Sequence, residues 1–96
     1  MIERNLLVST RLGLHARAAA KLVRVASDYQ SSVRLWRLDG GASADAKSIL
    51  SVLMLAAGRG TELLASTDGV DEEAAMNAIE QLFAEGFGEM EPESSI

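Results

Sequence analysis

The spacing of hydrophobic and polar residues predicts how the chain folds from its first residues onward. β-forming residues over positions 3–8 predict a first strand. From Ala16 onward, apolar residues recur every three or four positions, which predicts a helix with one face against the core. That buried face comprises Ala19, Leu22, Val23 and Ala26. Arg17, Lys21 and Arg24 follow another stripe of the same helix, so the sequence predicts three positive charges on one exposed face.

Alternation in the middle of the chain predicts a β-hairpin. Over residues 33–38 one face of the strand holds Val33, Leu35 and Arg37, and the opposite face holds Arg34, Trp36 and Leu38. The Asp-Gly-Gly sequence at residues 39–41 is a strong turn signal. We therefore expect residues 42–44 to begin the returning strand.

The second half of the chain predicts a helix, a strand and another helix. "KSILSVLMLAAGRG", residues 47–60, predicts a short helix that Gly58 and Gly60 terminate. Residues 61–66 alternate as in a strand. Residues 71–87 predict a last helix, whose acidic first turn suits the helix dipole. Its inward face comprises Ala75, Ile79, Leu82 and Phe83.

The resulting order, β-α-β-β-α-β-α, predicts an α+β fold of one domain. The simplest way to pack these elements is an open-faced sandwich, in which three helices cover one face of a four-stranded sheet. The pattern leaves the order of the strands within the sheet open. We expect the domain to span residues 1–88 and the polar residues 89–96 to form a disordered tail.

The composition restricts the class of protein. Of the 96 residues, 48% are hydrophobic and 24% are charged, as in a single globular domain. No apolar run approaches the about 20 residues of a membrane-spanning helix, so we expect a soluble protein with no membrane insertion. With no cysteine and one histidine, we expect neither a metal site nor a cofactor. The lack of cysteine also fits the cytoplasm, and a monomer is the default expectation.

The charges are distributed unevenly along the chain. Residues 1–47 hold eight of the nine basic residues, whereas residues 48–96 hold ten of the fourteen acidic ones. This asymmetry favours an oriented, charged partner over general affinity for nucleic acid. Ordinary surface solubility is the alternative explanation.

The only histidine, His15, falls directly before the first predicted helix, at the N-cap position. The first amides of a helix lack internal partners and attract anions. Histidine is a poor default cap, and its neutral imidazole is a nucleophile near neutral pH. A phosphoryl group on a ring nitrogen would meet the amides of Ala16, Arg17 and Ala18 and the Arg17 guanidinium. The alternative is a capping histidine without chemistry.

The second predicted helix is apolar nearly all round, at Ile49, Leu50, Val52, Leu53, Met54 and Leu55. A short helix beside solvent carries so many apolar residues only where it is buried or docks a partner, and both readings stay open. Ser48 opens this helix, where serine is a common cap. A phosphate on Ser48 would add negative charge beside the apolar residues.

Several segments together resemble the HPr family, the histidine-containing phosphocarriers of the bacterial phosphoenolpyruvate-dependent phosphotransferase system. They are "GLHARAAAKLV", "DAKSILSVLML", "GRGTELLASTDG" and "LFAEGF", and the similarity covers about residues 2–87. "LMLAAGRGTEL" and "LFAEGFGE" are similar to the nitrogen-related branch, called NPr. "KS" before the second helix is more typical of the sugar branch, so the branch stays open.

The resemblance implies roles for particular residues. His15 would accept a phosphoryl group at Nδ1 from phospho-enzyme I and pass it to an enzyme IIA protein, and Arg17 would stabilise the charge of that group. Ser48 would be the regulatory serine that an HPr kinase/phosphorylase modifies in some bacteria. Partners would dock on apolar and basic residues: Ile49, Leu50, Leu53, Met54, Lys21, Arg24 and Lys47. The protein would be a phosphoryl carrier rather than a turnover catalyst.

The sequence departs from the family at Ala18, where "GLHARPA" commonly has proline. Proline in a first turn pre-sets the helical backbone, whereas Ala18 keeps an N–H that can donate toward phosphate. A degenerate HPr-like regulatory or interaction domain is therefore an alternative function. A nucleic-acid-binding β-α-β sandwich is a further one, but it would need aromatic residues on the sheet, and only Trp36 lies on a predicted strand. No motif supports a small-molecule-binding or dimerising domain.

Overall fold

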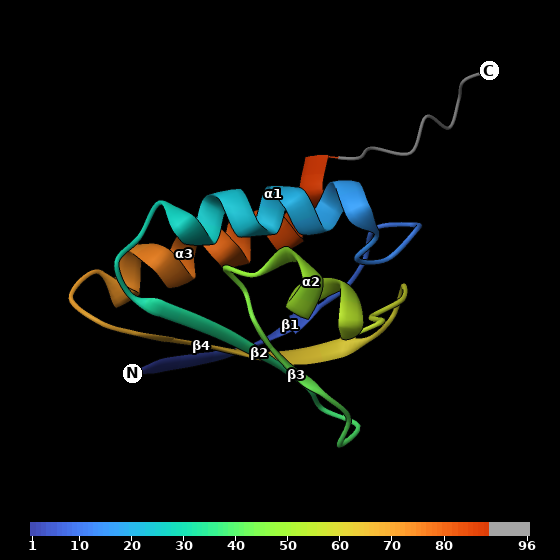
Figure 1. Ribbon diagram of the computed structural model, residues 1–96, viewed down its shortest axis with the longest axis horizontal. Coiled ribbons are helices and arrows are strands. Elements are labelled where there is room, and N and C mark those ends of the chain that lie inside the picture. The colour runs from blue at the N-terminus through green and yellow to red at the C-terminus, as the bar shows by residue number, and fades with distance from the viewer. Residues whose placement is uncertain (89–96) are drawn as a thin grey trace.

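The computed structural model describes residues 1–88 and contains the predicted elements in the predicted order (Figure 1). The strands are β1 (Ile2–Leu7), β2 (Ser32–Arg37), β3 (Ser43–Asp45) and β4 (Glu62–Asp68). The helices are α1 (Ala16–Ser27), α2 (Ile49–Met54) and α3 (Glu72–Ala84), followed by a 3₁₀ turn, η1 (Gly86–Gly88). The tail predicted over residues 89–96 lies outside the described residues.

The four strands form one antiparallel sheet in the order β1-β4-β2-β3. The central strand β4 pairs with both β1 and β2, which are far from it in the sequence. β3 is a short edge strand that pairs only with β2, opposite Leu35 and its neighbours. Local patterns could not predict this order, because each pairing with β4 depends on contacts between distant segments.

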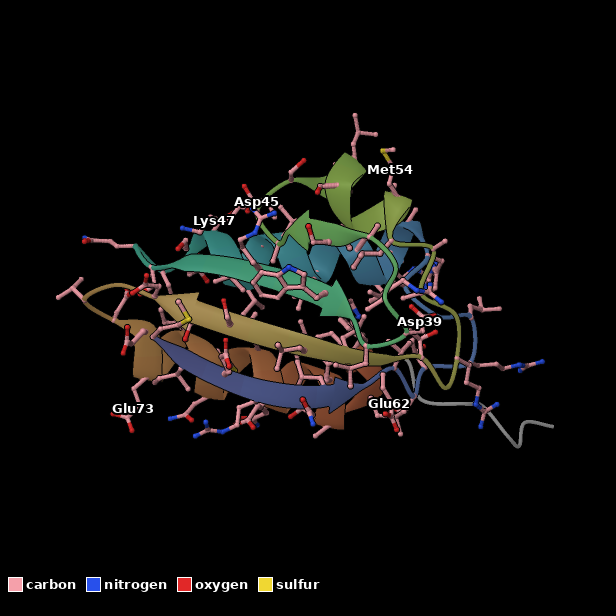
Figure 2. All side chains as sticks on the ribbon, turned by 90° about the horizontal axis from the view of Figure 1, so that it is seen from below. Asp39, Asp45, Lys47, Met54, Glu62 and Glu73 are labelled. Carbon is pink, nitrogen blue, oxygen red and sulfur yellow. The ribbon has the colours of Figure 1, made fainter. Side chains whose placement is uncertain are left out.

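The three helices cover one face of the sheet and leave the other open, as predicted (Figure 1). Leu22 of α1, Leu35 of β2, Leu63 of β4 and Ile79 of α3 are fully buried between the two layers. The open face carries the alternate residues, and Figure 2 shows the sheet with Asp45 on the edge strand β3 and Glu62 at the start of the inner strand β4. The alternation read from the sequence therefore assigns the two faces of the sheet correctly.

Two predicted helix ends are wrong. The second helix ends at Met54, before Gly58 and Gly60, because Ala56 takes up the left-handed conformation (φ 53°) that ends the helical path. The last helix ends at Ala84 rather than at Phe87, which has a φ of 60° in η1 and turns back into the core against Phe83. Alanine rarely adopts this conformation, so the sequence carries no signal for the end of α2. The end of α3 does carry one, because Gly86 (φ 61°) directly follows the C-cap residue Glu85.

The α1–β2 and β4–α3 connections are joined by Asp71. This residue occupies the N-cap position of α3 but its carboxylate does not cap that helix. It accepts hydrogen bonds from the backbone N–H groups of Gln30 (2.8 Å) and Ser31 (2.9 Å) and from the Ser31 hydroxyl. The Ser31 hydroxyl bond, together with these amides, lowers the pKa of Asp71.

Stability is therefore expected to depend on the ionisation of Asp71. Because the folded-state pKa of Asp71 is lowered, its carboxylate stabilises the fold above the unfolded pKa of about 3.9. This contribution is lost as the pH falls through the folded pKa. Urea midpoints should therefore be lower for Asp71→Asn than for the parent protein at pH 7, and the gap should shrink below pH 4. The exposed Glu73→Gln variant is the charge-matched control, and an equal, pH-independent gap for both variants would contradict the assignment.

Candidate functional site

His15 is the N-cap residue of α1, as the sequence predicts. Its backbone is extended, its carbonyl accepts the first α-helical bond, from Ala19 N–H at 2.8 Å, and its side chain turns toward the start of the helix. Nδ1 accepts a hydrogen bond from the backbone N–H of Arg17 at 3.3 Å. Because Nδ1 accepts this hydrogen bond, it carries a lone pair rather than a proton, and the proton of the neutral ring is on Nε2. The nucleophilic lone pair thus faces the amides of the helix N-terminus.

The amides of Ala16, Arg17 and Ala18 precede the helical ladder, because Ala19 is the first residue that closes an α-helical turn. These are the three amides that the sequence predicts for an anion. The Ala18 side chain is buried, so this alanine fills the core side of the turn, while Ala16 and Arg17 are exposed. The positive end of the helix dipole therefore lies beside the imidazole, and the exposed Arg17 belongs to the same first turn.

The loop that carries His15 is fixed against the segment after α2. Leu14 N–H donates to the carbonyl of Ala57 at 2.9 Å, and the Gly13 N–H donates to Thr10 at 3.0 Å. Gly13 has a φ of 73°, and a Cβ on it would lie 2.7 Å from the Ala57 oxygen. Only glycine allows so close an approach of two backbones with this conformation. The orientation of His15 thus depends on residues more than forty positions away in the sequence.

α2 presents an apolar surface at the same end of the molecule as the start of α1 (Figure 1). Leu50 is 70% exposed and Met54 78% exposed, and Ile49 is exposed as well. Met54 points outward from α2 in Figure 2. Val52 and Leu55 are buried and Leu53 is half-buried, so the reading that all six residues form core is wrong. We refer to Ile49, Leu50 and Met54 as the α2 surface.

The basic residues expected around this surface do not all face solvent. The Lys21 ammonium donates to the carbonyl of Phe87 at 2.7 Å, so it holds η1 against α1 and does not share an exposed stripe. The Lys47 ammonium donates to the carbonyl of Tyr29 at 2.8 Å. Arg17 and Arg24 are exposed as predicted. The helical period predicts which stripe Lys21 occupies, but not the carbonyl that its long side chain reaches.

Ser48 is the N-cap of α2, which agrees with its predicted place at the start of that helix. Its hydroxyl accepts from the Ser51 N–H at 3.4 Å, and its carbonyl accepts from the Val52 N–H at 3.0 Å. The side chain is half-buried and lies next to Ile49 in the sequence. The capping role accounts for serine here, and any modification would act directly beside the α2 surface.

Leu12 is a surface residue that the sequence analysis did not single out. It is 70% exposed in the loop three residues before His15. A large apolar residue in a polar loop beside a glycine was the available signal. Leu12 is thus a further exposed apolar residue in the loop that leads to the imidazole.

The geometry combines a nucleophilic ring nitrogen, an amide-lined helix terminus and an exposed apolar surface. Such a site can hold a phosphoryl group on the imidazole and bind a protein partner beside it. Within residues 1–88, no helix is both long and apolar enough to cross a membrane.

Comparisons with known proteins agree with this geometry. The family model described as "PTS HPr component phosphorylation site" matches residues 2–85. The chain is 47% identical over 91 residues to the phosphocarrier protein HPr of Cupriavidus necator, which covers 95% of this chain and 100% of that protein. It is 46% identical over 89 residues to the phosphocarrier protein HPr of Xylella fastidiosa (strain 9a5c), covering 93% and 98% of the two chains.

A solved structure is also similar over nearly the whole chain. The crystal structure of HPr from Thermoanaerobacter tengcongensis superposes with a TM-score of 0.88 at 33% sequence identity, covering 95% of this chain and 100% of that one. The two chains are therefore similar both in their open-faced sandwich fold and in their sequences. The chain therefore belongs to the HPr family, the phosphocarriers of the phosphotransferase system.

Proposed function

We propose that this phosphocarrier accepts a phosphoryl group on Nδ1 of His15 from phospho-enzyme I and passes it to an enzyme IIA protein. The observation that carries the proposal is the hydrogen bond from Arg17 N–H to His15 Nδ1 at the start of α1. It orients the nitrogen lone pair toward the amides that would bind the phosphoryl oxygens. Family membership supplies the two partner classes.

The transfer is a displacement at phosphorus. The Nδ1 lone pair forms the new N–P bond while the bond between phosphorus and the donor atom breaks. The donor keeps the electron pair of that bond, and the proton that it takes up is balanced by the Nε2 proton that the phosphorylated ring gives up. On phosphorylation, the Arg17 amide changes its acceptor from Nδ1 to a phosphoryl oxygen, and the Arg17 guanidinium adds charge-assisted hydrogen bonds. The reverse steps deliver the group to the acceptor protein.

Partner docking is proposed on the α2 surface and Leu12, with Leu53 beneath it and Arg24 as the exposed basic residue at its rim. A carrier must release each partner after transfer, which suits a small apolar patch whose charged rim speeds encounter more than it strengthens binding. The ammonium groups of Lys21 and Lys47 are engaged by the carbonyls of Phe87 and Tyr29, so we expect them to contribute less to docking than Arg24. We expect the carrier to act as a cytoplasmic monomer, although one related structure is described as an HPr dimer.

The direct test is to incubate the protein with phosphoenolpyruvate, magnesium and purified enzyme I, and to measure intact mass before and after acid treatment. We expect the gain of one phosphoryl group that acid removes and alkali does not, as for an N–P bond. Subsequent addition of an enzyme IIA protein should discharge it. An unmodified mass would instead favour the degenerate interaction domain, and an acid-stable phosphate would place the modification on a hydroxyl.

Ser48 is proposed as a regulatory site for an HPr kinase/phosphorylase. A negative charge at Ser48 should weaken docking on the α2 surface without unfolding α2, since aspartate also caps helices well. For Ser48→Asp we expect the KM of enzyme I for the carrier to rise about tenfold, which corresponds to about 1.4 kcal/mol of lost docking energy.

Ser48→Asn is the matched control, because asparagine caps as well but carries no charge. Its KM should equal that of the parent protein. Equal KM values for the aspartate and asparagine variants would rule out charge at Ser48 as a regulatory signal.

A further inference from the structure

Arg37 lies at the end of β2, on the core side of the sheet, and its side chain is only 24% exposed. Its Nη1 donates to the carbonyls of Leu55 at 2.9 Å and Ala56 at 3.0 Å. Its Nε and Nη2 donate to the Asp39 carboxylate, with Nη2 at 2.8 Å from Oδ2. One guanidinium thus joins the β2–β3 hairpin to the end of α2.

The Asp39 carboxylate fixes the direction of this guanidinium. Asp39 also accepts from the Gly41 N–H at 3.0 Å, which holds the carboxylate within its own turn. Arg37 lowers the pKa of Asp39 through their hydrogen bond, so the pair stays ionised well below neutral pH. The planar guanidinium of Arg37 is therefore held by the carboxylate on one side and by the two carbonyls on the other. A lysine ammonium, which is not planar, would not be fixed in this way.

The carbonyls that Arg37 binds belong to the segment that supports the phosphoryl acceptor. α2 has only six residues and no basic residue in its last turn, and Arg37 supplies the donor for two carbonyls at its C-terminal end. Ala56 is left-handed there, a conformation disfavoured for a residue with a Cβ. The next residue, Ala57, accepts the Leu14 N–H and lies against Gly13.

We propose that Arg37 is a positioning residue for phosphoryl transfer, which holds the 55–57 segment in the conformation that sets the direction of the His15 ring. This inference rests on the proposed function. It assigns a role in the reaction to a residue of β2 that lies outside the phosphoryl site itself. Arg37 touches neither the imidazole nor the transferred group, and acts only through the backbone of Ala57 and Leu14.

The test compares Arg37→Gln with Arg34→Gln. Arg34 lies on the same strand and carries the same charge, but its guanidinium lies on the open face, over the Trp36 ring at 5.9 Å. With enzyme I, we expect the kcat for phosphorylation of Arg37→Gln to fall by roughly tenfold or more with little change in KM, because small displacements of a reacting group are costly. The Arg34→Gln variant should retain the parent kcat.

Two further readouts separate positioning from loss of fold. Hydrogen exchange of the Leu14 amide should accelerate in Arg37→Gln while amides in the centre of β4 stay protected. Phosphorylation by phosphoramidate, a small donor that needs no docking, should slow by the same factor as with enzyme I. Arg37→Lys keeps a charged donor for the carbonyls but loses the fork to Asp39, so its rate should lie between those of the parent and Arg37→Gln. If the glutamine variant does not fold, this lysine variant carries the comparison.

The outcomes distinguish this inference from the proposed function. If the parent protein gains no phosphoryl group on His15, the proposed function fails. If the parent protein is phosphorylated and the Arg37 variants keep its kcat, or change only KM, the positioning role is wrong. Equal slowing in Arg34→Gln would likewise overturn it, since the effect would then follow net charge.

Discussion

Replacing His15 by asparagine is expected to abolish phosphoryl transfer while leaving the fold as stable as that of the parent protein. Asparagine is a preferred N-cap residue, so α1 keeps its capped start. It has no nucleophilic ring nitrogen, so no N–P bond can form. His15→Asn therefore separates the chemistry of this position from its structural role, which an alanine variant would not do.

The measurement is the initial rate of acid-labile phosphate incorporation from phosphoenolpyruvate and enzyme I, beside a thermal melt of each variant. His15→Ala should be equally inactive but less stable, by about 1 kcal/mol for the lost cap. Ser48→Ala should retain incorporation, since its hydroxyl caps α2 and does not meet the phosphoryl group. Acid-labile phosphate on His15→Asn at the parent rate would move the acceptor to another residue.

Replacing Arg17 by alanine is expected to slow transfer by roughly a hundredfold, as for the loss of one preorganised donor to a developing charge. The backbone amide of Arg17 remains, so the hydrogen bond to Nδ1 and the direction of the ring should survive. The side chain is exposed at the first turn, and alanine is a better helix former, so stability should change little.

Arg17→Lys tests whether charge alone suffices, and Arg34→Ala controls for the loss of one positive charge far from the ring. We expect the lysine variant to recover part of the rate, because a single ammonium cannot replace the planar fork. Full transfer rates in Arg17→Ala would remove the guanidinium from the mechanism and leave the amides as the only phosphate donors.

The sequence predicts the element order because each element carries a local period that burial of one face imposes. The strand over residues 32–37 and the helix from Ala16 follow this rule, and even the inward direction of Arg37 is visible in the alternation. The N-cap position of His15 is also a local property, since it depends only on where the helical period begins.

The features that the sequence did not reveal depend on distant contacts. The ammonium of Lys21 reaches a carbonyl 66 residues away, and the Arg37 guanidinium reaches carbonyls beyond the next strand. The end of α2 is set by the left-handed Ala56 and not by a glycine. None of these features can be seen in the hydrophobic periodicity of the sequence, because each depends on one long side chain or on one backbone conformation.

The central claim is that the ring nitrogen facing the amides of α1 carries the phosphoryl group. The most direct measurement is the NMR spectrum of ¹⁵N-labelled protein phosphorylated by enzyme I. We predict phosphorus coupling to Nδ1 of His15, with downfield shifts of the Ala16, Arg17 and Ala18 amide protons as they bind the phosphoryl oxygens. Coupling to Nε2, or unshifted amides beside a phosphorylated ring, would contradict the account.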